Sequence, residues 1–181
     1  MQLAISQFSK LAEVNDEEAC LYLSLIYKYG EDGVPQDELK AKRLRKKYVE
    51  ILLDKANRGD VQSKLKYAYI LQYGDGIKMD ENKALDLFKE LAQDDVTEAQ
   101  FHLYTIFCHG FCQQSHDSIT ANYWLEKAFT SNWPEAIYIK ALQILSNDDD
   151  SLEAMNLLEK ASDLGFFPAK ECLKTKTNPP L

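Results

Sequence analysis

Tyr73-Gly74-Asp75-Gly76-Ile77 is followed at residues 80–84 by Asp-Glu-Asn-Lys-Ala, and this combination recurs in the chain. An earlier copy reads Tyr-Gly-Glu-Asp-Gly-Val at 29–34, and a degraded third copy reads His-Gly-Phe-Cys at 109–112. Each copy lies between two segments with helical periodicity, so the repeating unit is predicted to be a helix, a glycine turn and a second helix. Units of this kind stack on their chain neighbours and form an extended protein that presents a surface.

A small residue opens the first helix of each unit and sets the register of the repeats. These anchors are 44, 36, 37 and 33 residues apart, the period of a helical solenoid: Ala19, Ser63, Ala99, Ala136 and Ala169. A glycine follows eleven residues later in three copies, at Gly30, Gly74 and Gly110. These glycines are predicted to stop the first helices in the left-handed conformation. Asn147 takes the same place in the fourth copy, and we expect it to tolerate that conformation.

The second helices carry an apolar stripe at helical spacing, as in Ala84, Leu87, Phe88 and Leu91. The first repeat contains an insertion, because its closing position arrives at Lys55, fourteen residues after Ala41 instead of seven. Seven extra residues are about two helical turns, so the apolar face stays nearly in phase. This helix is therefore predicted to project further than the others.

The order of these features resembles the Sel-one-like repeat, a relative of the tetratricopeptide repeat with a longer loop. The shared pattern is A-x3-[LY]-[small]-x2-[YFL]-x2-G, then G-[VI], D, K-A and a closing A-x3-G, and it covers roughly residues 4–170. The chain departs from it at Cys112 and Gln113, at Lys140, and in a fourth turn without glycine. The resemblance implies an all-α, right-handed α-α superhelix of about four helix-turn-helix repeats plus capping helices, with the first helices lining the concave surface.

The predicted organisation is a single repeat domain over residues 1–174, followed by a flexible tail at 175–181. The domain comprises a capping helix at 2–13, repeats at about 16–58, 60–93, 96–130 and 133–164, and a terminal helix at 166–174. With 181 residues, of which 45% are hydrophobic, the chain can bury a substantial core. No segment approaches membrane-spanning length and no secretory signal is evident, so we expect a cytoplasmic location.

Positive charge is concentrated in one segment of an otherwise acidic chain. Six of the 21 basic residues lie within residues 40–47, whereas the chain has 29 acidic residues and a formal net charge of −8. The cluster fits the solvated face of a long helix with Leu44 and Tyr48 facing inward, and it also fits contact with an acidic partner, RNA or a membrane surface. The acidic remainder favours a basic protein partner, such as a toxin or effector, because opposite fields accelerate encounter. A nucleic acid, a membrane or a small-molecule substrate is not expected.

Residues with catalytic or metal-binding chemistry do not form a recognisable set. The sequence has no G-x-S-x-G, phosphate-loop or H-E-x-x-H motif. His102, Cys108, His109 and Cys112 are the one local group with ligand chemistry, but structural zinc usually takes clearer paired spacings. We therefore predict no enzymatic activity, no metal and no cofactor. A remote alternative is a β-lactamase-like enzyme, which the resemblance suggests because some cysteine-rich secreted relatives have been described as weak β-lactamases.

Helical phase indicates a candidate binding face on the first helices. Counted from each anchor, positions 0, +4, +7, +8 and +11 face the core, so +3, +6 and +10 lie on the opposite side. An inert face would carry Glu and Lys, whereas this one carries four tyrosines, two histidines and three aliphatic residues. Tyrosine is a preferred interface anchor, because it buries a large area with few rotors. Leu25 and Leu142 on this face fit either partner binding or packing between neighbouring first helices. The predicted partner-binding residues are Tyr22, Tyr29, Lys66, Tyr69, Tyr73, His102, Thr105 and His109.

These observations favour a non-enzymatic module that binds a protein partner on its concave face. Within this class, a short acidic array without attached domains looks like a bacterial immunity protein that neutralises a cognate toxin. A regulatory adaptor or scaffold in signalling is the alternative. A nucleic-acid binder that uses the segment 40–47 forms a third class.

We predict that Cys20, Cys108, Cys112 and Cys172 are reduced, because they do not recur at matched positions in each helix pair. All four thiols should react with a thiol reagent in denaturant without prior reduction, and reductant should leave the melting temperature unchanged. A shift on a non-reducing gel, or thiols that react only after reduction, would instead indicate an exported, disulfide-clamped protein.

Overall fold

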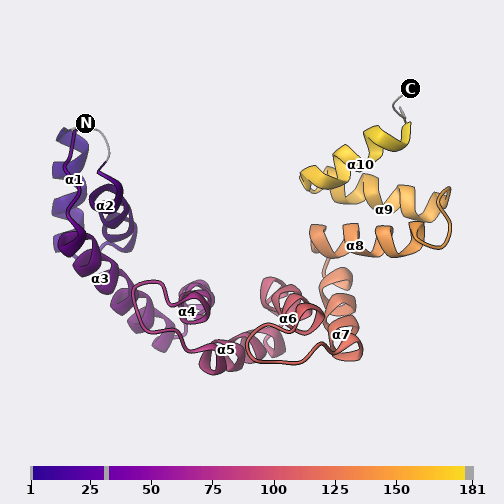
Figure 1. Ribbon diagram of the computed structural model, residues 1–181, viewed down its shortest axis with the longest axis horizontal. Coiled ribbons are helices and arrows are strands. Elements are labelled where there is room, and N and C mark those ends of the chain that lie inside the picture. Colours follow the sequence, from indigo (N-terminus) through magenta and orange to yellow (C-terminus); the bar gives the residue numbers. More distant parts are fainter. Residues whose placement is uncertain (1, 31–32, 178–181) are drawn as a thin grey trace. The chain divides into compact units, whose positions relative to one another are not determined.

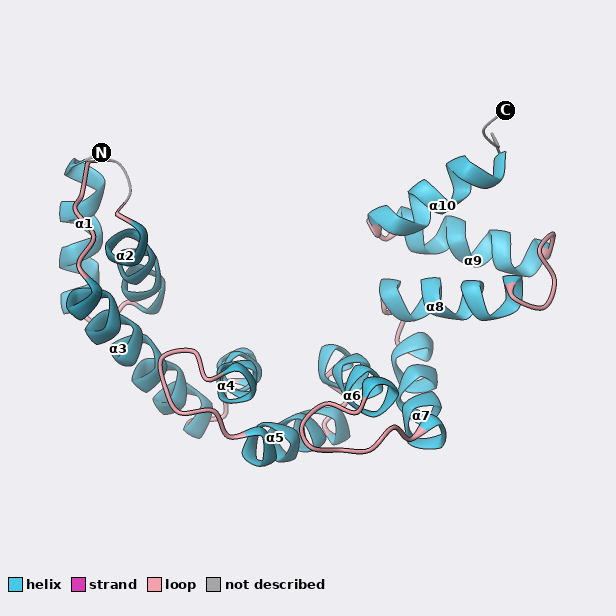
Figure 2. Cartoon of the chain, viewed as in Figure 1, coloured by secondary structure: helices cyan, strands magenta, loops and turns pink. Residues whose placement is uncertain are grey.

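The computed structural model describes residues 2–30 and 33–177, and within these ranges it contains ten α-helices and no strand (Figures 1 and 2). The helices are α1 Gln2–Glu13, α2 Glu17–Tyr29, α3 Glu38–Asn57, α4 Val61–Tyr73, α5 Glu81–Gln93, α6 Thr97–His109, α7 Ser118–Thr130, α8 Pro134–Leu145, α9 Leu152–Asp163 and α10 Phe167–Thr177. The prediction of an all-α fold built from helix-turn-helix repeats is confirmed. The terminal helix α10 continues beyond the predicted end at 174, and the last part of the predicted tail, 178–181, lies outside the described residues.

The chain forms two compact units, Met1–Phe88 and Lys89–Leu181, with the boundary inside α5. In the first unit, α2 packs on both α1 and α3, and α3 packs on α4. In the second unit, α6 packs on α7, α7 on α8, α8 on α9, and α9 on α10. Helices thus pack mainly against their neighbours in the chain, as stacked helical repeats do.

The small residues that set the register all lie in the core. The five anchors are at most 3% exposed: Ala19, Ser63, Ala99, Ala136 and Ala169. The small residues five positions after three of these anchors are equally buried: Ser24, Ala68 and Ala141. Short side chains at these points let helix backbones approach closely, and larger residues such as Leu23, Leu103 and Ile137 fill the space beside them.

Glycine ends three of the first helices in the predicted conformation. Gly30, Gly74 and Gly110 have φ of 69°, 70° and 73°, and each amide donates to the carbonyl four residues earlier at 2.9 Å. The expectation for Asn147 is wrong, because this residue is not among those with positive φ. There, α8 ends through right-handed Ser146, and the Asn147 side-chain amide donates to the Gln143 carbonyl at 3.1 Å. The Asn147 side chain and nearby backbone N–H groups donate hydrogen bonds to carbonyls in the last turn of α8, so no left-handed residue is required.

A second left-handed residue precedes each first helix. It lies four residues before the anchor in every repeat and is Asn, Gly or Asp: Asn15, Gly59, Asp95, Asn132 and Gly165. Asn and Asp enter this region more readily than other residues with a side chain. Each repeat therefore uses a left-handed residue to turn the chain from a second helix into the next first helix.

The insertion in the first repeat lengthens one helix, as predicted. α3 has 20 residues, whereas its neighbours α2 and α4 have 13 each. Its last turn supplies Lys55, which donates to Glu17 at the start of α2 at 2.6 Å, and Lys66 of α4 donates to the other oxygen of Glu17 at 2.8 Å. The Glu17 side chain is only 14% exposed. This carboxylate therefore links three helices of the first unit.

Replacing Gly74 by Ala should destabilise the protein by about 1–2 kcal/mol, because an L side chain resists φ of +70°. A Cβ there would also lie 3.1 Å from the Cβ of Met79. The matched control is Gly59→Asn, since a Cβ at residue 59 meets no atom within 4 Å and Asn occupies the same register at Asn15 and Asn132. Urea denaturation should find the control within about 0.5 kcal/mol of wild type. Equal midpoints for Gly74→Ala and wild type would contradict the assigned backbone.

Replacing Glu17 by Gln should cost about 1 kcal/mol at neutral pH, since two charge-assisted hydrogen bonds weaken. Burial raises the pKa of Glu17, but the hydrogen bonds from Lys55 and Lys66 outweigh it and leave the pKa below its ordinary 4.5. Its stabilisation is therefore full above the unfolded pKa and is lost as pH falls through the lower folded pKa. The difference in unfolding free energy between wild type and variant should vanish over that acidic window.

The control for this experiment is Glu18→Gln, which removes a charge from the same first turn of α2. It should cost less than Glu17→Gln at neutral pH. Equal losses in the two variants would mean that Glu17 stabilises the fold only through the helix dipole and not through its contacts with Lys55 and Lys66.

Candidate functional site

The predicted face of the first unit is most exposed where its first helices end. Tyr29 and Tyr73 are the last residues of α2 and α4, and their exposed fractions are 62% and 69%. Each stands directly before a left-handed glycine, so the two tyrosines occupy the same register in consecutive repeats. Tyr22 is half exposed, and its ring lies 5.8 Å from the ring of Phe8 in α1.

Two predicted residues of the first unit are engaged in packing. The ring of Tyr69 meets the ring of Phe88 edge-on, with 5.1 Å between centroids. Lys66 is held by Glu17, as described above. The helical periodicity of the sequence placed Tyr69 and Lys66 on the face opposite the core. It could not show that α5 reaches Tyr69 or that the start of α2 reaches Lys66.

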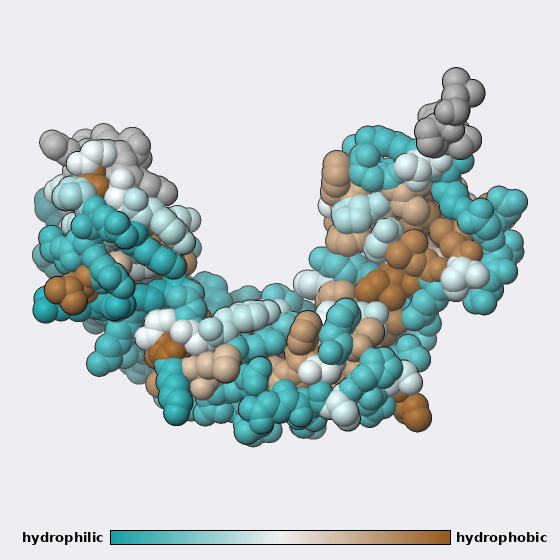
Figure 3. Space-filling view, viewed as in Figure 1, coloured by the Kyte–Doolittle hydropathy of each residue, from teal (hydrophilic) through white to brown (hydrophobic). Residues whose placement is uncertain are grey.

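The predicted residues of the second unit lie along α6. His102 is half-buried, and burial lowers its pKa to about 4, so its ring is neutral at physiological pH. Thr105 donates its hydroxyl to the His102 carbonyl at 2.7 Å. His109 is exposed at the register of Tyr29 and Tyr73, and its ring stacks on Phe111 with 5.5 Å between centroids. In the same unit, hydrophobic residues gather over α8 and the adjoining part of α9 (Figure 3).

The four residues with metal-ligand chemistry do not converge on one metal site. Cys112 is buried and Cys108 donates its thiol to the Tyr104 hydroxyl at 3.7 Å. Within 2–30 and 33–177, no group of three or more His, Cys, Asp or Glu side chains is arranged to hold a metal ion. All four cysteines are unbridged.

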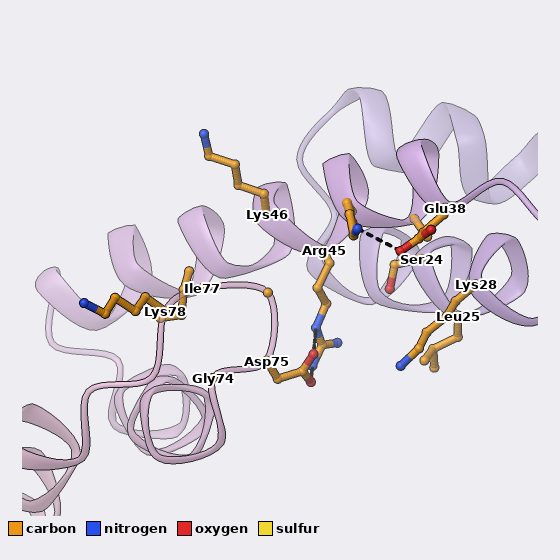
Figure 4. Close-up of a pocket in the computed structure, with 13 residues that line it drawn as sticks. Ser24, Leu25, Lys28, Glu38, Arg45, Lys46, Gly74, Asp75, Ile77 and Lys78 are labelled. Atoms are coloured by element: carbon orange, nitrogen blue, oxygen red, sulfur yellow. Dashed lines mark hydrogen bonds and ion pairs between the residues drawn. The ribbon is translucent and has the colours of Figure 1, made fainter.

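The first unit contains a pocket of about 630 Å³ that the sequence did not predict. It lies between the C-terminal half of α2, the first half of α3 and the loop at residues 74–78 (Figure 4). Its walls are formed by Ser24, Leu25, Lys28, Glu38, Ala41, Lys42, Arg45, Lys46, Gly74, Asp75, Gly76, Ile77 and Lys78. This volume is within the range of about 300–1,000 Å³ that is typical of ligand sites.

An ion pair between α3 and the loop closes one side of the pocket. Arg45 donates from Nε to one oxygen of Asp75 at 3.1 Å and from Nη2 to the other oxygen. Its guanidinium also lies 4.9 Å from the centroid of the Tyr48 ring. A Cβ on Gly76 would come within 2.6 Å of the Arg45 Cγ, so the loop backbone lies directly against the arginine stem. This two-point contact fixes the loop relative to α3.

The basic cluster of residues 40–47 divides between two sides of α3. Lys42, Arg45 and Lys46 line the pocket described above. On another side, Lys40 lies over the ring of Tyr27 and Lys47 donates to the Ala12 carbonyl at 2.5 Å. Leu44 is half-buried and Tyr48 is buried, as predicted for the inward face. The helical spacing of residues 42, 45 and 46 is the sequence signal that could have separated the two sets.

No helix within the described ranges combines the length and the apolar composition that crossing a membrane requires.

Comparison with known proteins identifies the repeat. The family model of the Sel1 repeat matches residues 17–46, 61–96, 97–132 and 148–166, which together make up more than half of the chain. The gap at 133–147 contains α8, whose end departs from the glycine pattern.

One named relative is similar to part of the chain, and two solved structures are similar to nearly all of it. Over 82 residues, or 45% of the chain, it is 34% identical to chitin synthase regulatory factor 3 of Schizosaccharomyces pombe, but this segment is only 9% of that protein. A Sel1 repeat protein from Oxalobacter formigenes superposes with a TM-score of 0.61 at 18% identity, covering 96% of this chain and 66% of the other. A protective antigen of uropathogenic Escherichia coli with an SLR fold gives 0.58 at 19% identity, covering 94% and 43%. The family match and the helix-turn-helix architecture together show that the chain belongs to the Sel1 repeat family.

Proposed function

We propose that this protein is a non-enzymatic binding module that holds a protein partner on the exposed face of its first unit. Sel1 repeats generally serve as protein-interaction modules. The observation that carries the proposal is the pair Tyr29 and Tyr73, which are exposed at the same register of consecutive repeats. Tyrosine is enriched among the residues that anchor protein interfaces, because it supplies a large and rigid contact area with a polar tip.

The local geometry supports the use of these tyrosines as anchors. Tyr29 and Tyr73 each precede a glycine whose N–H donates a hydrogen bond to the carbonyl four residues earlier, so each ring projects from a hydrogen-bonded helix end. The ammonium of Lys28 lies 5.2 Å from the centroid of the Tyr29 ring, which restrains that side chain further. Anchors that are ordered before binding lose little entropy when a partner covers them.

A regulatory adaptor is the role that we propose for this module. The support is the 34% identity to a protein named as a chitin synthase regulatory factor. An immunity protein that neutralises a toxin is the second candidate, and the net charge of −8 favours it, since an acidic protein attracts a basic toxin. The two roles differ in what binding does to the partner: an adaptor leaves it active and brings it to another protein, whereas an immunity protein abolishes its activity.

Replacing Tyr29 or Tyr73 by Ala should weaken partner binding by about 2 kcal/mol, or about thirtyfold, while leaving the fold intact. Tyr123→Ala is the control, because Tyr123 is also more than half exposed but lies on a second helix of the other unit. Partners captured from the native host by each variant can be compared by quantitative mass spectrometry, and those lost only from the Tyr29 and Tyr73 variants can then be titrated by calorimetry.

Wild-type affinity in both tyrosine variants would place the binding face elsewhere. Co-expression of the captured partner with this protein separates the two roles. Rescue of growth from a toxic partner would favour the immunity protein, and retained partner activity would favour the adaptor.

A further inference from the structure

We infer that the pocket between α2, α3 and residues 74–78 binds an acidic segment of a partner protein, with carboxylates on its lysines and an aliphatic side chain on Leu25 or Ile77. The inference rests on the proposed protein-binding function and adds the chemistry of the bound segment. Its basis is the charge of the pocket, the arrangement of its cations and its apolar wall.

The pocket is positively charged within an acidic protein. Five of its lining residues are cationic and two are acidic, although the whole chain has a net charge of −8. Asp75 is already paired with Arg45, and Glu38 lies 2.7 Å from the ammonium of Lys42. Both lining carboxylates are therefore engaged, and an excess of positive charge faces the pocket.

Two of the lysines that line the pocket have no carboxylate partner in the described part of the chain. Within the described residues, no carboxylate lies within ion-pair distance of Lys28 or Lys78, and Lys28 can turn from the Tyr29 ring, 5.2 Å away, onto a ligand. Lys28 extends from α2 toward the Arg45–Asp75 pair, whereas Lys78 and Lys46 extend outward from the rim (Figure 4). Because lysine side chains are long and flexible, the rim ammonium groups can turn onto a carboxylate that enters the pocket.

The remaining wall of the pocket is apolar. Leu25 of α2 is 37% exposed and Ile77 is half-buried, and Ala41 of α3 lies between the charged residues of its helix. An aliphatic side chain that covers Leu25 or Ile77 would remove apolar surface from water and exclude water from the neighbouring ion pairs. The pocket thus combines an apolar contact with charges of one sign.

An acidic peptide segment fits these features better than a nucleic acid. A polynucleotide carries phosphates along its whole length but has no aliphatic side chain to cover Leu25 or Ile77. A short protein segment can match its carboxylates to the pocket alone and can supply the aliphatic side chain. The net charge of the chain favours a basic partner, whereas the pocket favours an acidic segment. Both can hold, because surface charges more than about 10 Å apart are screened and the pocket acts only on the segment inside it.

The test uses the full chain and a labelled peptide with a central leucine between glutamates, titrated by fluorescence anisotropy. Two comparison peptides replace every glutamate by glutamine or the leucine by serine, and single-stranded RNA forms a fourth arm. The acidic peptide should bind, its affinity should fall with rising salt, and both replacements should weaken it. RNA that binds more tightly than the peptide would overturn the inference.

The variant Lys28→Glu/Lys78→Glu should lower the affinity for the acidic peptide by about tenfold or more. The control Lys127→Glu/Lys160→Glu changes the net charge by the same amount, and both of its lysines are exposed in last turns of second-unit helices, as Lys28 is in α2. The control should bind like wild type. Equal losses in the two double variants would show a general charge effect and would overturn the pocket.

The peptide assay also separates this inference from the proposed function. If the tyrosine variants lose no partner but the acidic peptide binds and depends on Lys28 and Lys78, the pocket stands and the tyrosine face does not. If the peptide fails to bind while a captured partner depends on Tyr29 and Tyr73, the protein-binding function stands and the acidic-segment inference falls.

Discussion

The left-handed backbone at the helix ends is the constraint on which the rest of this structure depends. A chain of stacked helices must reverse direction after every helix, and an L residue with a large side chain resists the required φ. Glycine meets the requirement at the end of three first helices, and Asn, Gly or Asp meets it before every first helix. These residues fix the helix ends of the repeats except at the end of α8, so they also help to fix which side chains reach the core. The burial of all five small anchors follows from that register.

The same constraint builds the candidate site. Gly74 ends α4 and sends the chain into the loop that follows, and Gly76, which is also left-handed, lets this loop lie against the stem of Arg45. Asp75 stands between the two glycines and pairs with the guanidinium of Arg45. The Arg45 side chain is only 18% exposed, so its charge is desolvated on one side and directed to Asp75. A loop that would otherwise be a simple connection thereby becomes one wall of a pocket.

Charge in this protein has to be considered by location. The net charge of −8 describes the field at a distance, whereas a bound segment meets the side chains within a few ångströms. The six cations of residues 40–47 form one cluster in the sequence, but α3 presents them on different sides. One set contributes to packing against α1 and α2, and the other faces the pocket. Tyr29 at the end of α2 directly follows the pocket residue Lys28, and Tyr73 at the end of α4 directly precedes the pocket residue Gly74. Aromatic and charged side chains therefore lie in the same part of the first unit.

The sequence by itself determined the helices, the repeat register, the glycine stops and the long third helix. These features depend on local rules, namely a 3.6-residue period and the backbone freedom of glycine, which act over a few neighbouring residues. Tertiary structure alone decided that Tyr69 meets Phe88, that Lys66 is bound by Glu17, and that Arg45 pairs with Asp75, 30 residues away. Such contacts depend on how one helix pair packs on the next, and residue spacing within a single helix carries no information about that packing.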